Sequence, residues 1–145
     1  MAGSHEAIGW LRPDSDFALP AAVARLAERL PKSKVSPHGK SASVSFRGWE
    51  VWVHLVEEGH VAEEAREFAT WYPDDPRAAP VAECARRVEV ECSDEDPRGR
   101  HRKDFLAVCS VLAEFRGVLL RDPVEGCWRA GGPAEPGAAP DPAGM

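Results

Sequence analysis

The sequence lacks the features that assign a chain at once to a large class of proteins. No run approaches the roughly eighteen apolar residues that a membrane-spanning helix needs. No basic segment followed by a hydrophobic block stands at the N-terminus, so we expect no secretory signal. A glycine-rich phosphate loop and a G-x-S-x-G nucleophile elbow are also absent. We therefore expect a cytoplasmic protein without a recognisable catalytic motif and without a membrane partner.

Cysteine is scarce, and none of the four cysteines belongs to a C-x-x-C pair. Structural zinc sites use such closely spaced pairs, so we predict neither a metal site nor a cofactor. Cys92 and Cys109 fall on predicted core faces, and without an export signal reduced thiols are expected. On one helix His101 and Cys109 would lie about 12 Å apart, too far for a nucleophile–base pair.

Lysine is also scarce, with 4 lysines against 14 arginines in a chain whose formal net charge is −6. An acidic balance argues against nucleic-acid binding, which needs a basic surface. It would suit a basic protein as partner. The preference for arginine, alanine and proline is typical of GC-rich bacterial coding.

The length of 145 residues predicts one domain. Gly131–Met145 is nearly all Gly, Ala and Pro, and such a segment buries too little apolar surface to fold. We predict a partly disordered N-terminal arm over residues 1–13, a domain over 14–130 and a disordered tail over 131–145.

The clearest local pattern is a β-hairpin formed by two alternating runs on either side of Arg47-Gly48. A two-residue connection fixes the register of the two strands, so one face of the hairpin is apolar throughout. The predicted cross-strand pairs on that face are Phe46 with Trp49, Val44 with Val51 and Ala42 with Val53. The other face carries Ser41, Ser43, Ser45, Glu50, Trp52 and His54.

Helical and strand periodicities predict the remaining elements. We expect helices from Pro20 to Leu30, over 61–72, from about Pro76 or Pro80 to Ala85, and over 100–115, with strands over 33–36, 42–47, 49–56, 87–92 and 118–121. The last strand–helix–strand unit would form a right-handed parallel crossover. The predicted fold is α+β, a mixed sheet of four to five strands with an antiparallel hairpin, a C-terminal βαβ unit and helices mainly on one face.

The outer face of the hairpin is the first candidate site. Trp52 would be a large aromatic side chain among small hydroxyls, and tryptophan is enriched at binding hot spots. The strand over 87–92 adds an acidic face that would be wet or meet a positive partner. We predict a partner-binding surface of Ser43, Glu50, Trp52, His54, Glu89 and Glu91. The alternative is that a helix or the segment around Trp10 covers Trp52.

A second candidate lies before the last helix, where cations cluster. Positive charge opposes the helix dipole there, whereas helix N-termini attract anions. One interpretation is an anion or acidic-partner contact made by Arg98, Arg100, Arg102 and Lys103. The other is a solvated loop balanced by the acids of Ser93–Asp96.

Size, acidity and the closing segment Val118–Trp128, VLLRDPVEGCW, resemble small bacterial immunity proteins of polymorphic toxin systems. The resemblance implies a non-enzymatic protein-binding domain that neutralises a toxin, and it transfers no site residue. The alternative is a small enzyme or ligand-binding domain. It would use a cleft at the carboxyl ends of the last two strands, where open sheets often bind ligands.

Overall fold

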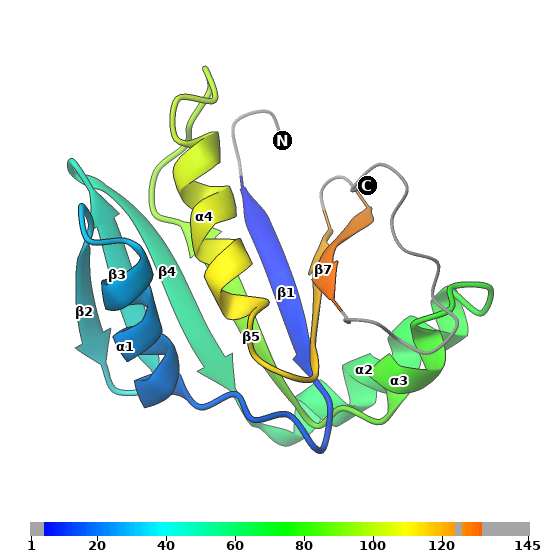
Figure 1. Cartoon of the computed structure of the whole chain (residues 1–145). Coiled ribbons are helices and arrows are strands. Elements are labelled where there is room, and N and C mark those ends of the chain that lie inside the picture. The colour runs from blue at the N-terminus through cyan, green and yellow to red at the C-terminus, as the bar shows by residue number, and fades with distance from the viewer. Residues whose placement is uncertain (1–4, 124–125, 132–145) are drawn as a thin grey trace.

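The helical and alternating patterns give four helices and seven strands over residues 5–123 and 126–131, which the computed structural model describes (Figure 1). In chain order they are β1 (Glu6–Leu11), α1 (Leu19–Arg29), β2 (Lys34–His38), β3 (Ser41–Phe46), β4 (Trp49–Val56), α2 (Gly59–Trp71), α3 (Ala78–Ala82), β5 (Arg86–Cys92), α4 (Arg102–Leu112), β6 (Val118–Asp122) and β7 (Cys127–Gly131). The predicted α+β class is confirmed.

The strands form one sheet in the order β2-β3-β4-β5-β1-β6-β7. Every neighbouring pair in this described sheet is antiparallel. The prediction of a mixed sheet with four to five strands is therefore wrong in strand number and in pairing. The sequence did not signal β1 or β7, because both are short and lie beside segments of small residues and prolines.

Strand β1 occupies the middle of the sheet and pairs with both β5 and β6. Residues 6–11 are thus part of the domain, and the predicted N-terminal arm over 1–13 is wrong for this segment. Gly9 makes the close packing possible, since an added Cβ would lie 2.7 Å from a methyl carbon of Val88. The predicted tail over 131–145 lies outside the described residues except for Gly131, which ends β7.

The C-terminal strand–helix–strand unit differs from the prediction in one respect. Because β5 and β6 are each antiparallel to β1, they run parallel to each other. They do not pair, however, since β1 lies between them. The predicted parallel crossover therefore becomes a split unit, in which α4 connects two strands separated by a third.

The hairpin of β3 and β4 has the predicted register. Phe46 lies opposite Trp49, Val44 opposite Val51 and Ala42 opposite Val53. The turn residues Arg47 and Gly48 have φ values of 54° and 87°. Positive φ at both positions is the requirement of the tight hairpin turn that matches strand twist.

Helices cover both faces of the sheet, so the prediction of helices mainly on one face is wrong. On one face α1 and α4 pack on the main core, which includes Leu26, Val53 and Val108 (Figure 1). On the other face α2 and α3 contribute Val61 and Val81 to a second cluster around Trp10 and Leu119. These β1 and β6 residues alternate with core residues of the first face, as the period of two requires.

The second face carries polar residues where it extends beyond α2 and α3. We call this part the open face and define it by Ser36, His38, Ser41, Ser43, Ser45, Glu50, Trp52, His54, Glu89 and Glu91. Apart from Ser43, which is buried, these residues are partly or fully exposed. The hairpin is therefore apolar on the side of α1 and polar on the side that faces solvent.

Candidate functional site

The open face brings the six predicted partner-binding residues together. Alternation places Glu50, Trp52 and His54 on the same side of β4, and the pairing of β4 with β5 sets Glu91 beside Trp52 and Glu89 beside His54. Ser43 lies opposite Trp52 on β3. Glu6 of β1 pairs with Glu91 and extends the row. The result is a cross-strand row of Ser43, Trp52, Glu91 and Glu6.

Trp52 is partly exposed and lies between two histidines. Its ring centroid is 5.1 Å from that of His38 and 5.9 Å from that of His54, whose ring is parallel to within 5°. The Ser43 hydroxyl is buried beside it, 3.4 Å from Nε2 of His38. The neighbouring rings restrict the indole, so Trp52 presents one face in a fixed orientation.

His54 is held by a line of hydrogen bonds across three strands. Its Nδ1 is 2.7 Å from Oγ of Ser41, and its Nε2 is 3.1 Å from Oε2 of Glu91. A serine, a histidine and a carboxylate in line are also the parts of a nucleophilic triad. The side chains of Ser41, His54 and Glu91 line neither the cavity of about 320 Å³ beside α2 nor the cavity of about 400 Å³ before α4. The arrangement fixes the orientation of the His54 ring.

The two acids of β5 have different surroundings. Oε2 of Glu89 accepts a hydrogen bond from Nε of Arg87 at 2.7 Å, and Glu64 of α2 accepts another from the same guanidinium. Glu89 therefore has a cation beside it, which it shares with Glu64. Glu91 contacts only the imidazole of His54 among the described ion pairs, and its side chain is 59% exposed. Glu91, rather than Glu89, supplies negative charge to a partner.

The sequence did not predict an aromatic groove at the border of the open face. Trp71 and Tyr72 at the end of α2 are 77% and 44% exposed, which is exceptional for large apolar side chains. They line a cavity of about 320 Å³ together with Ile8, Trp10, Glu64, Glu67, Phe68 and Arg87. Adjacent aromatic residues at the end of the 61–72 pattern were the available signal.

The basic segment before α4 is divided by the structure. Helix α4 begins at Arg102, so Arg102 and Lys103 lie in its first turn, whereas Arg98 and Arg100 precede it. Arg100 lines a second cavity, of about 400 Å³. The other three predicted anion-binding residues do not line it. The predicted cluster is thus not a single site.

The Asp96 side chain binds the two backbone amides that immediately precede α4. Its carboxylate accepts the N–H groups of Arg100 and His101 at 2.9 Å and 2.8 Å. Burial of this carboxyl opposes ionisation, but the hydrogen bonds from His5, His101 and Arg100 outweigh that effect and lower its pKa below the ordinary value. Asp96 therefore fixes the turn that leads into α4, although the N-cap residue His101 makes no side-chain capping hydrogen bond.

Three further properties bear on the function. Within the described residues, no helix is long and apolar enough to cross a bilayer, and no group of three or more His, Cys, Asp or Glu side chains could hold a metal ion. All four cysteines are free. Comparison of the chain with protein-family models, with curated proteins and with solved structures finds no match. The function must therefore be argued from the surfaces themselves.

Proposed function

We propose that the protein is a non-enzymatic bacterial protein-binding domain and that its open face binds a basic protein. The observation that carries the proposal is the row in which Trp52 is followed by Glu91 and Glu6 on neighbouring strands. An aromatic anchor beside carboxylates that no Lys or Arg of the described residues pairs with is suited to an arginine or lysine side chain, through cation–π contact and ion pairing.

The surroundings of Trp52 favour a binding role. The stacking on His38 and His54 fixes the indole before a partner arrives, so less side-chain entropy is lost on association. Hydroxyl groups of Ser41 and Ser45 add small polar contacts around it. A rigid aromatic centre with a polar surround is the usual composition of an interface hot spot.

Charge defines the class of partner. The chain has a formal net charge of −6, and Glu6 and Glu91 lie side by side at one end of the open face. A positively charged partner would associate faster and would relieve the repulsion between these neighbours. In the immunity interpretation this partner is a toxin domain, and the open face would block or clamp its basic surface.

The test uses the full chain immobilised and exposed to lysate of the native host. Wild type is compared with Trp52→Ala, with the charge reversal Glu91→Arg, and with Trp71→Ala as a control that removes an exposed tryptophan elsewhere. We expect wild type and Trp71→Ala to retain the same basic protein, identified by mass spectrometry. Trp52→Ala and Glu91→Arg should retain at least tenfold less, and salt should weaken the complex.

The result that would overturn the proposal is equal retention by all four proteins, or loss with Trp71→Ala alone. Circular dichroism checks that the variants are folded. If Trp52→Ala does not fold, then Glu91→Arg decides, because Glu91 is exposed and its substitution leaves the core intact. Protection of cells by co-expression with a toxin encoded beside this chain would identify the partner.

The alternative, a small enzyme or ligand-binding domain with a cleft at the carboxyl ends of β5 and β6, has less support. The beginning of β1 lies between those two strand ends, since Glu6 pairs with Glu91 and Ile8 pairs with both Glu89 and Arg121. The space in which a doubly wound sheet binds its ligand is thus filled by a strand.

A further inference from the structure

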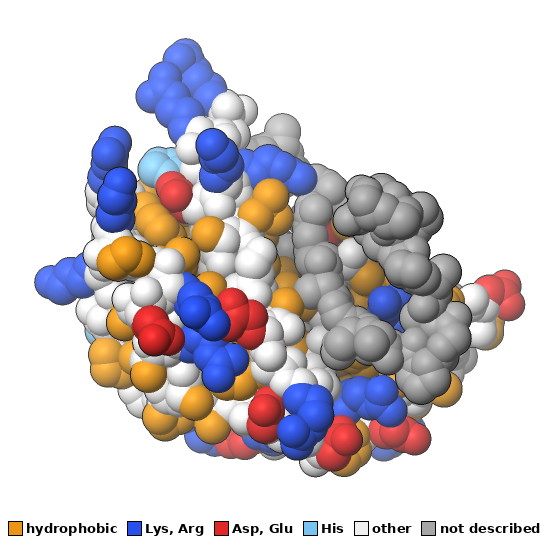
Figure 2. All heavy atoms as spheres, viewed as in Figure 1, with side chains coloured by type: hydrophobic (Ala, Val, Ile, Leu, Met, Phe, Trp, Pro, Cys, Tyr) orange, Lys and Arg blue, Asp and Glu red, His pale blue; other side chains and the backbone are white. Residues whose placement is uncertain are grey.

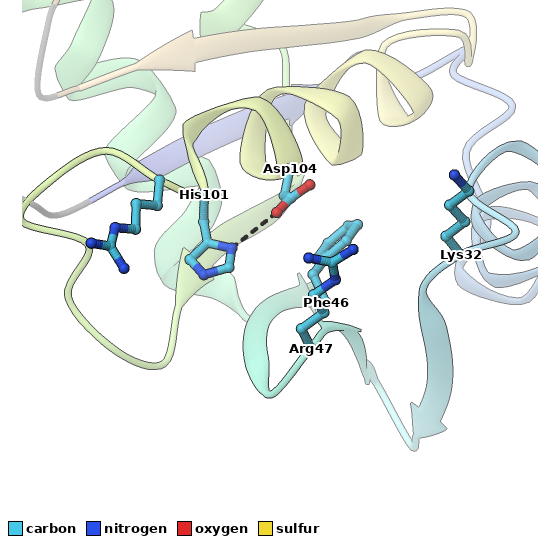
Figure 3. Close-up of a pocket in the computed structure, with 6 residues that line it drawn as sticks. Lys32, Phe46, Arg47, His101 and Asp104 are labelled. Atoms are coloured by element: carbon cyan, nitrogen blue, oxygen red, sulfur yellow. Dashed lines mark hydrogen bonds and ion pairs between the residues drawn. The ribbon is translucent and has the colours of Figure 1, made fainter.

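A cavity of about 400 Å³ lies on the side of the sheet opposite the open face, at the end of the helical layer. Three segments distant in sequence meet there: the connection from α1 to β2, the β3–β4 turn and the start of α4. The residues that line it are Lys32, Phe46, Arg47, Arg100, His101 and Asp104 (Figure 3). Its size is in the range of small-molecule sites.

The lining is strongly positive. Within the described residues, Lys32, Arg47 and Arg100 form no ion pair, whereas Arg29, Arg87 and other cations elsewhere do. Figure 2 shows Lys and Arg side chains gathered over the β3–β4 turn and the start of α4, with a histidine beside them. Three uncompensated cations around one hollow, in a chain of net negative charge, are an unusual arrangement for a surface shaped by solubility alone.

His101 is held rigidly at the wall of this cavity. Its ring stacks on Trp49 with centroids 4.6 Å apart and planes within 5° of parallel. Nδ1 lies 2.9 Å from Oδ2 of Asp104, and because a carboxylate only accepts, Nδ1 carries the hydrogen. Nε2 is turned away from Asp104 (Figure 3), and in the neutral ring this nitrogen only accepts a hydrogen bond. Asp104 is therefore engaged in orienting the imidazole.

Arg47 is placed in the cavity by a left-handed backbone. It is the only non-glycine residue with positive φ in the described chain. Asparagine, aspartate or glycine would suit this turn position better, because a larger side chain is strained there. A strained residue that also supplies a cation to a cavity indicates a functional reason for its identity.

We propose that this cavity binds the phosphate group of a small phosphate monoester whose flat ring packs on Phe46. Guanidinium groups match phosphate oxygens in pairs, and a lysine adds a single contact. The backbone amides of Arg100 and His101 already bind Asp96, so the side chains hold the phosphate. Phe46 is partly exposed and gives the apolar part of the ligand a surface.

The experiment is calorimetric titration of the full chain with phenyl phosphate, inorganic phosphate and phenol, in a low-salt buffer free of other polyvalent anions. Phenyl phosphate should bind at least tenfold more tightly than inorganic phosphate, and phenol should give no measurable binding. Arg47→Asn should weaken phenyl phosphate at least tenfold. This variant keeps a favourable residue in the turn, so its fold is retained.

Arg98→Gln is the control, because it removes one exposed cation from the loop that carries Arg100 and does not line the cavity. Its affinity for phenyl phosphate should stay within twofold of wild type. Equal weakening by Arg98→Gln and Arg47→Asn would mean general attraction to a positive surface and would overturn the proposal. Absence of phenyl phosphate binding, or equal affinity for inorganic phosphate, would overturn it as well. None of these outcomes depends on the open face.

Discussion

His5 and Asp96 join the beginning of the central strand to the beginning of α4, with Nε2 of His5 3.0 Å from Oδ2 of Asp96. The two residues are 91 positions apart in the chain. His5 also stacks on Phe105 of α4, with ring centroids 5.3 Å apart. Asp96 thus connects the turn that precedes α4 with the segment that begins β1, and its loss affects both segments.

Replacement of Asp96 by alanine is expected to reduce the free energy of unfolding by about 1–3 kcal/mol, because several buried or partly buried donors lose their acceptor together. Urea unfolding followed by circular dichroism measures the change. Glu95→Ala is the control, since Glu95 is exposed and adjacent, and its effect should stay within about 0.5 kcal/mol. Equal effects of the two substitutions would contradict this role of Asp96.

The Asp96 carboxylate also makes the stability of the folded protein depend on pH. Because the pKa of Asp96 is lowered in the folded state, its ionised form stabilises the protein above the ordinary aspartate pKa. That contribution is lost as the pH falls through the lowered pKa. Urea unfolding at about pH 6 and about pH 3 should therefore show a smaller decrease in stability for Asp96→Asn than for wild type. Parallel decreases would show that other carboxylates carry the effect.

Gly9 is expected to tolerate no side chain. A Cβ would lie 2.7 Å from Cγ1 of Val88 and 3.2 Å from Cδ1 of Leu120, so Gly9→Ala should cost about 1–3 kcal/mol of stability. Gly59 at the start of α2 is the control, because a Cβ there meets no atom within 4 Å. Gly59→Ala should be neutral or stabilising by up to about 1 kcal/mol. Thermal unfolding of the two variants distinguishes these outcomes.

Cys84 is expected to be far less reactive than the partly exposed thiols, for an electrostatic reason. Burial raises its pKa to about 12, so the thiolate is almost absent near neutral pH. Labelling with iodoacetamide at about pH 8, followed by peptide mass spectrometry, should modify Cys84 at least tenfold more slowly than the partly exposed Cys92 and Cys127. In urea this difference should disappear, and rapid labelling of Cys84 in the native protein would contradict the prediction.

Local patterns were sufficient for the hairpin. Alternation on both sides of Arg47-Gly48 sets the register, and this register alone places Trp52, His54 and Ser43 on one face. The helical periodicities also predicted α1, α2 and α4, and the predicted ends lie within a few residues of the observed ones. The last helix is shorter than predicted at both ends, and it begins at Arg102 because Asp96 accepts the amides of the preceding turn.

The sequence did not predict that β1 lies in the middle of the sheet. Its six residues contain a glycine that, by local propensity, weakens a strand, although in the sheet its lack of a side chain lets Val88 and Leu120 approach. The cationic cavity was equally hidden, since Lys32, Arg47 and Arg100 come from three segments. Pairwise charge patterns along a chain do not report contacts between distant segments.

The sequence alone determined which residues share a strand or a helix face, because side-chain direction follows local periods of 2 and 3.6 residues. The tertiary structure decided which strands are neighbours, which part of one face remains without a helix and which cations surround a common cavity. These depend on the packing of whole elements, where the free energy is gained by burying faces that no local segment can bury by itself.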